Sequence, residues 1–199
     1  VAAGGERGDG LDSESRATMA LLLAGAGLCN DAQLERADDD DTYLAVGDPT
    51  EAALAVAAAR LGFPKDRLLE SFPRVSELPF DSERKRMTTV HRVPVAQATS
   101  QTQPAQDELI QTIARFQCPY MAFTKGAVDS LLETCQFAWQ EGQSLPLDDG
   151  LRARIADANA SLAASGMRVL GVALRPLSSQ AAGQASPTNA AGNQFNIEQ

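Results

Sequence analysis

Hydrophobic residues along this chain of 199 residues recur with two spacings, one typical of helices and one typical of strands. Helical spacing and capping residues predict helices at residues 13–29, 49–61, 65–71, 127–135 and 148–165, with Ser13 near the first N-cap. Runs rich in β-branched and aromatic residues predict strands at residues 43–46, 74–80, 84–93, 120–126, 137–147 and 167–177. Residues 107–118 fit either a short helix or a strand. The mixture predicts an α+β fold.

The order of these segments favours a mainly antiparallel, twisted β-sheet flanked by helices, because successive strands can pair as hairpins. The turn-like residues 81–83 join 74–80 to 84–93 in this way. The segment 167–177 is apolar enough to be a central strand.

Polar and low-complexity stretches divide the chain into a lead, one domain and a tail. We expect residues 1–12 to be a flexible lead, 13–177 to form the domain, and 178–199 to be a disordered low-complexity tail. The acidic stretch from Glu35 to Asp41 reads as a solvated loop, and the polar residues 94–108 read as a mobile surface loop.

The stretch GDPTEAALAVAAARLG, residues 47–62, opens and closes one helix. Asp48 suits the N-cap, Pro49 the first helical position, and Gly62 the C-terminal stop. Glu51 can reach back to close a capping box, or it can hold a ligand. The local sequence leaves both roles open.

Composition and charge narrow the class of function. The formal net charge of −9 argues against nucleic acid and anionic lipid as main partners, and three cysteines without a CxxC motif argue against a disulfide framework or a metal site. A single histidine, His91, cannot form a metal site alone. The sequence has no run of about 18 apolar residues, which is the length that a helix needs to span a bilayer.

Three short stretches could carry chemistry. Arg84, Lys85 and Arg86, with His91 and Arg92 beyond them, form a basic island that is either a phosphate-attracting surface or a strand edge kept positive to prevent pairing. In FTKGA, residues 123–127, a lysine ends a strand beside a glycine that permits close approach of a ligand. GMRVLGVALR, residues 166–175, begins a strand after a helix stop.

Familiar catalytic and phosphate-binding motifs are missing from the sequence. It has no GxxxxGK[ST], no GxSxG and no HExxH, and the GAG at 25–27 lacks the strand–turn–helix context of a phosphate loop. The residues therefore indicate a binding domain rather than a complete catalyst.

Four stretches in this order and spacing, GDPTEAAL, LPFDSERKRMTTV, FTKGAVDSLLETC and GMRVLGVALR, resemble the nucleotide-binding domain of P-type cation-transporting ATPases. The resemblance covers about residues 13–176 and is greatest to the calcium-pump and sodium/potassium-pump branch. It implies the antiparallel α+β fold of that domain.

The resemblance also implies an adenine pocket. In it, Phe80 would stack on the ring, Lys125 would line the opposite side, and Gly126 and Ala127 would permit close approach. Glu51 would accept a hydrogen bond from the exocyclic amine, directly or through water.

Four further binding residues follow from the same resemblance. Lys85 would lie beside the pocket and help to hold the nucleotide, and Arg168 would reach towards the phosphates. Met87 and Leu170 would supply apolar packing near the base.

One position departs from the pattern of the muscle calcium pump, in which the residue two positions after the stacking Phe is basic. This position is Ser82 here, and Arg84 and Arg86 are the neighbouring cations that could replace it.

By this resemblance the chain would bind ATP, and Mg²⁺ would arrive mainly with the nucleotide. The chain would be a soluble domain on the cytoplasmic side of a membrane cation pump. Calcium is the expected transported ion. The sequence has no DKTGT motif, so the phosphorylated Asp is expected in a separate phosphorylation domain, and this chain should not turn over ATP. No catalytic residue and no protein metal ligand is expected.

The implied partners are ATP and the phosphorylation and actuator domains of the same pump, with no nucleic acid, no direct membrane contact and a monomeric state. The alternative is a non-catalytic protein-interaction module that uses the basic strand 84–92.

Overall fold

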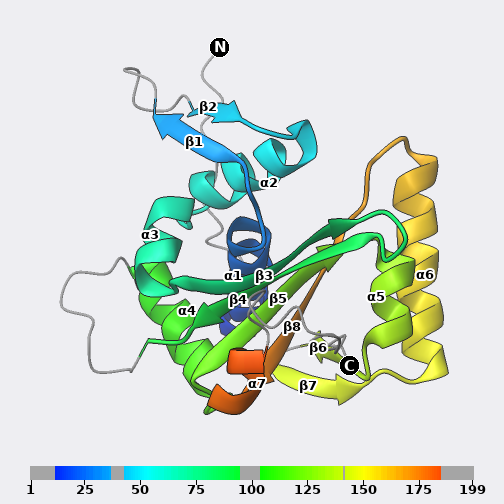
Figure 1. Ribbon diagram of the computed structural model, residues 1–199. Helices are drawn as coiled ribbons and strands as arrows, with labels where there is room; N and C mark the ends of the chain where they lie inside the picture. The colour runs from blue at the N-terminus through cyan, green and yellow to red at the C-terminus, as the bar shows by residue number, and fades with distance from the viewer. Residues whose placement is uncertain (1–11, 37–42, 95–103, 141, 185–199) are drawn as a thin grey trace.

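The computed structural model describes residues 12–36, 43–94, 104–140 and 142–184, and they form an α+β fold, as the sequence predicts (Figure 1). In chain order the elements are α1 (Ser13–Leu28), β1 (Gln33–Arg36), β2 (Tyr43–Val46), α2 (Pro49–Arg60), α3 (Lys65–Ser71), β3 (Arg74–Asp81), β4 (Arg86–Arg92), α4 (Pro104–Ala114), β5 (Tyr120–Gly126), α5 (Val128–Thr134), β6 (Phe137–Gln140), β7 (Gln143–Pro146), α6 (Asp149–Ala164), β8 (Gly171–Leu177) and α7 (Ser179–Gln184).

The central sheet has four antiparallel strands in the order β3-β4-β5-β8. Two small hairpins, β1-β2 and β6-β7, lie outside it. The prediction of a mainly antiparallel sheet is confirmed. The prediction that 167–177 is a central strand is wrong, because β8 begins only at Gly171 and lies at the sheet edge. Its apolar residues reflect packing against α1 rather than pairing on both sides.

Helix α1 lies against one face of the central sheet and completes the core (Figure 1). A Cβ atom added to Gly25 would lie 2.3 Å from Val172 Cγ1 and 3.2 Å from Phe123 Cδ1, so glycine is needed for this close approach. The GAG stretch is therefore part of a helix–sheet contact. The largest fully buried apolar side chains in the core are Leu28, Leu68, Phe72, Met87, Leu109, Ile113, Met121 and Phe123.

Strand β4 corrects the interpretation of the basic island as a protected edge. It pairs with β3 on one side and β5 on the other, so it has no free edge. Residues 87–91 are buried, and Lys85 and Arg92 are exposed at either end of this run. The fold therefore keeps Arg84, Lys85 and Arg86 together at one end of β4 and places Arg92 at the other end.

Several boundaries differ from the sequence prediction. The N-cap of α1 is Asp12, whose side chain accepts from Ser15 N, rather than Ser13. Residues 33–36 form β1, which the expected acidic loop had included in part. Residues 104–108 belong to α4, so the loop expected at 94–108 is wrong there, and residues 95–103 lie outside the described residues.

The C-terminal half of the chain also differs in detail. Residues 179–184 form α7 within the expected tail, while the rest of the tail lies outside the described residues, as does the lead at 1–11. Helix α6 is present as predicted, but none of its residues is buried, and Leu162 on its expected apolar face is 42% exposed.

Candidate functional site

One end of the central sheet gathers most of the residues that the sequence singles out. The register pairs Arg86 with Gly126 and Gly126 with Gly171, so the end of β3, the start of β4, the end of β5 and the start of β8 lie in one row. The β3–β4 turn at this end lies beside α5 in Figure 1. Antiparallel pairing therefore brings together segments that are far apart in the sequence.

Glu51 enters this region from the first turn of α2. Asp48 caps the helix, its side chain accepting from the amides of Thr50 and Glu51 at 2.9 and 3.2 Å, and these hydrogen bonds are the main cause of its lowered pKa. Of the two roles that the sequence left open for Glu51, the structure does not show the capping box. Its carboxylate turns to Asp31 N and to Lys125 Nζ, at 2.9 and 2.7 Å.

The Glu51–Lys125 ion pair is largely buried. The Lys125 side chain is 7% exposed and that of Glu51 18%, and the two are 74 residues apart in sequence. Each carboxylate oxygen accepts one of these hydrogen bonds and has a second lone pair. Glu51 can therefore keep both contacts and still accept one more donor from the exposed side.

Phe80 lies at the same end of the sheet and is 63% exposed. It sits in an irregular part of β3, where the register with β4 shifts between Leu78 and Asp81. An exposed aromatic ring at the same end of the sheet as a buried ion pair would suit a flat heterocycle. Met87, by contrast, is 1% exposed and belongs to the core, so in this conformation it supports the sheet beneath rather than offering surface to a base.

Gly126 is required by the protein chain itself. A Cβ atom there would lie 2.6 Å from Lys85 O and 2.9 Å from Arg86 Cα, so the space beside Gly126 is filled by the neighbouring backbone. Ala127 N donates to the same Lys85 oxygen at 3.1 Å. Lys85 has a positive φ of 53°, and its exposed side chain lies 3.8 Å from Asp129. This backbone contact fixes the turn from which Lys85 projects.

Arg168 and Leu170 lie on the segment between α6 and β8. They line a hollow of about 530 Å³ together with residues from the first half of α2, including Pro49 and Thr50. Arg168 is exposed, and its positive charge is one of the smaller causes of the lowered pKa of Asp48. The guanidinium is thus a surface cation near the start of α2.

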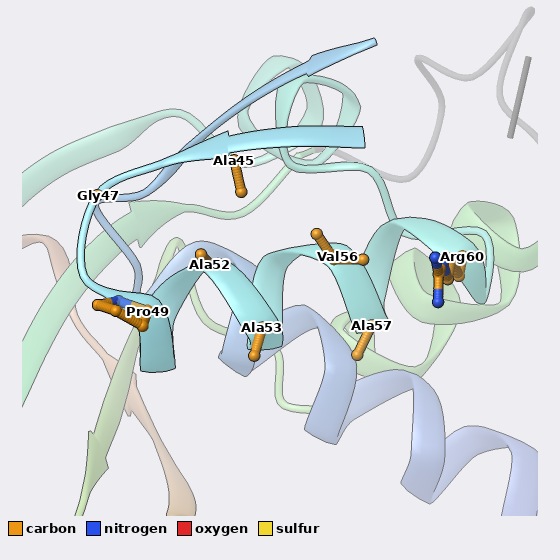
Figure 2. A pocket seen from close by; sticks show the side chains of 8 residues that line it. All are labelled: Ala45, Gly47, Pro49, Ala52, Ala53, Val56, Ala57 and Arg60. Atoms are coloured by element: carbon orange, nitrogen blue, oxygen red, sulfur yellow. The ribbon is translucent and has the colours of Figure 1, made fainter. Parts of the chain in front are cut away.

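A second hollow, of about 640 Å³, lies between β2 and α2 (Figure 2). It is lined mostly by small apolar residues, with Arg60 towards the end of the helix. None of the nine expected binding residues lines it. The fold therefore does not join this hollow to the row of strand ends.

Two further cations of the basic island, Arg84 and Arg86, have partners within the chain. Arg84 donates to Pro79 O at 3.0 Å, and Arg86 donates to Ser130 Oγ at 2.8 Å. His91 is fully buried, and burial is the main cause of its pKa falling to about 4. The expectation that His91 adds to a positive surface is therefore wrong.

Sequence reasoning missed a polar layer next to Glu51. Asn30 is fully buried and donates to Glu51 O, while Arg74 donates to the carbonyls of Leu28 and Asn30. Lys65 donates to Ala32 O at 2.7 Å, and burial is the main cause of its lowered pKa. The available signal was the polar pair Asn30–Asp31 immediately after an apolar helix.

The residues that the structure describes contain no group of three or more His, Cys, Asp or Glu side chains that could hold a metal ion. None of their helices is both long and apolar enough to cross a membrane.

Comparison with known proteins gives consistent results. Residues 18–199 match the family model described as P-type ATPase, cytoplasmic domain N. The chain is 33% identical to calcium-transporting ATPase 1 of Bacillus cereus over 159 residues, which are 80% of this chain and 15% of that protein. It is 35% identical to cation-transporting ATPase pma1 of Synechocystis over 153 residues, 76% of this chain and 14% of that protein.

A third relative is the probable cation-transporting ATPase F of Mycobacterium tuberculosis, 36% identical over 150 residues, which are 75% of this chain and 13% of that protein. The chain thus spans about one seventh of the length of these relatives. The match of the family model over most of the chain, and its agreement with the antiparallel α+β fold, lead to one conclusion: the chain belongs to the family of P-type ATPase cytoplasmic N domains.

Proposed function

We propose that this chain binds ATP at the end of the central sheet, with the base near Phe80, Lys125 and Glu51. The observation that carries the proposal is the presence, at one end of the sheet, of an exposed aromatic ring and of a largely buried ion pair whose carboxylate keeps accepting capacity. The family to which the chain belongs supports it.

The individual roles proposed are those that the family resemblance implies. Phe80 stacks on the adenine ring, and Glu51 accepts from the exocyclic amine. Lys125, which is largely buried, contributes its stem and its charge beneath the base, next in sequence to Gly126 and Ala127.

Lys85 and Arg168 attract the phosphates, because both carry exposed positive charge at this end of the domain. Leu170 supplies apolar surface next to Arg168, and Met87 supports the site from the core. Mg²⁺ binds mainly with the nucleotide. Arg84 and Arg86 already donate to Pro79 O and Ser130 Oγ, so a contact from either to phosphate in place of Ser82 would use other N–H groups of the guanidinium or a change of partner.

In a whole pump, this domain would present the γ-phosphate to an Asp of a phosphorylation domain and work with an actuator domain. We propose calcium as the transported ion, since calcium stands in the printed names of several relatives. Uptake of radioactive calcium by vesicles that contain the whole pump tests that assignment. Uptake of another cation alone would overturn it.

The alternative of an interaction module that docks through strand 84–92 is less well supported. Most of β4 is buried between two neighbouring strands, so the strand offers little continuous basic surface.

The test is an NMR titration of the isotope-labelled chain with ATP, with GTP as the control. We expect saturable amide shifts at Glu51, Phe80, Lys85, residues 125–127 and Arg168, larger for ATP, with a dissociation constant of about 1 mM because part of the phosphate contacts lies elsewhere in the pump. No saturable shift up to about ten times that concentration in a folded sample would overturn the proposal.

A second measurement separates binding from turnover. We expect no sustained release of phosphate from ATP by the pure chain, because its sequence has no DKTGT motif. Sustained release that co-purifies with the chain would contradict this expectation.

A further inference from the structure

Asn30 joins three segments next to the candidate adenine pocket. It is 0% exposed and lies just after α1. Its side-chain nitrogen donates to Ala26 O at 3.1 Å and to Glu51 O at 2.8 Å, and its side-chain oxygen accepts from Ala32 N at 2.9 Å. One buried amide thus connects the end of α1, the loop that follows it and the first turn of α2.

These hydrogen bonds determine where the carboxylate of Glu51 lies. The bond from Ala32 N to Asn30 Oδ1 closes an Asx turn, which sets the direction of the amide between them. That amide, Asp31 N, donates to Glu51 Oε2 at 2.9 Å. Asn30 therefore holds the backbone of Glu51 directly and its carboxylate through Asp31.

Two cations keep the loop itself in place. Arg74 of β3 donates to Leu28 O at 3.0 Å and to Asn30 O at 2.8 Å, so it binds the carbonyls at the end of α1. Lys65 of α3 donates to Ala32 O. The loop keeps these two anchors when Asn30 is changed, so the change should act mainly on Glu51 and on the Asp31 amide that binds it.

We propose that Asn30 is a positioning residue for base recognition, holding Glu51 with its accepting oxygen towards the exocyclic amine of adenine. The inference rests on the proposed function of ATP binding. It adds a residue that does not touch the nucleotide and acts only through Glu51.

The test compares ATP with purine riboside triphosphate, which lacks the exocyclic amine. Binding of both is measured by calorimetry or NMR titration for the unmodified chain, Asn30→Ala and Asn30→Asp. Asn30→Asp keeps the acceptor for Ala32 N and removes both donated hydrogen bonds. We expect both variants to weaken ATP binding about three- to tenfold and to leave binding of the purine analogue within about twofold.

The control for lost stability is Ile113→Ala, which creates a cavity in the core. Ile113 is on α4, a helix that carries none of the expected binding residues. It should leave the preference for ATP unchanged. If Asn30→Ala weakens both triphosphates equally, or if Ile113→Ala lowers the preference as much, Asn30 has only a structural role and the inference fails.

A double-mutant cycle with Glu51→Ala tests whether Asn30 acts through Glu51. We expect Asn30→Ala to have no further effect on ATP binding once Glu51 is removed. Independent, additive effects would overturn the inference alone. An unmodified chain that binds neither triphosphate would overturn the proposed function and with it this inference.

If the Asn30 variants do not fold, the unmodified chain supplies the answer. The Asn30 side-chain amide and the Asp31 backbone amide should shift on addition of ATP more than on addition of the purine analogue. Equal shifts for the two ligands would count against the role of Asn30.

Discussion

Two buried basic side chains, Lys125 and His91, lie on the same face of the central sheet but have partners of different kinds. Lys125 meets a carboxylate, Glu51, at 2.7 Å, near the sheet end that carries exposed Phe80. His91 lies on β4, four residues after Met87, which pairs with Lys125 in the sheet. Its ring nitrogens lie next to the carbonyl of Phe72 and the hydroxyl of Thr89. A carbonyl can only accept, so the His91 Nδ1 atom carries a proton, and burial lowers the pKa of the ring to about 4, which keeps it neutral at pH 7.

The difference teaches how the two ends of the sheet are used. Neutral hydrogen bonds are enough where packing is the only need, and the edge-to-face contact of His91 with Phe123 adds to that packing. A buried ion pair brings little net stability over an apolar pair of similar volume, but it places charge and accepting capacity at a surface. At the sheet end that carries Phe80, this accepting capacity is what the proposed binding of ATP would use.

Breaking the ion pair should have the largest effect. Glu51→Leu leaves Lys125 buried without its carboxylate, and we expect a loss of about 3 kcal/mol in the free energy of unfolding, measured with urea. Adding Lys125→Met to this variant should restore most of the loss, because an apolar pair then fills the space. A double variant as unstable as the single one would contradict this account of the pair.

The second largest effect should be a loss in the free energy of unfolding at acidic pH, caused by protonation of His91. Its pKa is about 4 in the folded chain against 6.5 for the free side chain, so the unfolded chain binds more protons between these values. The contribution is therefore fully present above pH 6.5 and is lost as the pH falls towards 4, by about 3 kcal/mol in total.

Urea unfolding at a series of pH values measures this loss, and His91→Gln should remove that part of the pH dependence. Carboxyls with lowered pKa, such as Asp12, Asp48 and Asp81, act at lower pH, below their usual value of 3.8. An unchanged profile in the variant would show that His91 is not the group responsible.

Crowding the strand end should have an intermediate effect. Gly126→Ala places a methyl group against the backbone of Lys85 and Arg86, and we expect a loss of about 2 kcal/mol in the free energy of unfolding, with weaker ATP binding. Gly150→Ala is the control, since the added atom has only Asp148 Oδ1 near it, at 3.4 Å. Equal stabilities of the two variants would argue against this close contact.

Removing the exposed ring should change stability least and binding clearly. Phe80→Ala should alter the free energy of unfolding by less than about 0.5 kcal/mol and weaken ATP binding about tenfold. Phe137→Ala on β6 is the matched control, because Phe137 is 57% exposed and Phe80 63%. If both variants bind ATP like the unmodified chain, the base does not stack on Phe80.

The sequence predicted many segments correctly because their signals are local. Asp48, Pro49 and Gly62 bound α2 through capping chemistry, and α3 has the bounds expected from its own residues. Strands β2 and β5 were found from β-branched and aromatic runs. The family could also be predicted from the sequence, because the resemblance rests on four short motifs and on their order along the chain, neither of which depends on knowing the fold.

Tertiary structure decided the partners. A capping box and an ion pair use the same Glu51 carboxylate, and nothing local shows that Lys125, 74 residues away, lies close enough to bind it. The strand order likewise made β8 an edge and β4 a central strand, because pairing depends on distant segments. Burial, which made His91 neutral and took Met87 into the core, is a property of all the elements packed around a side chain and not of its neighbours in sequence.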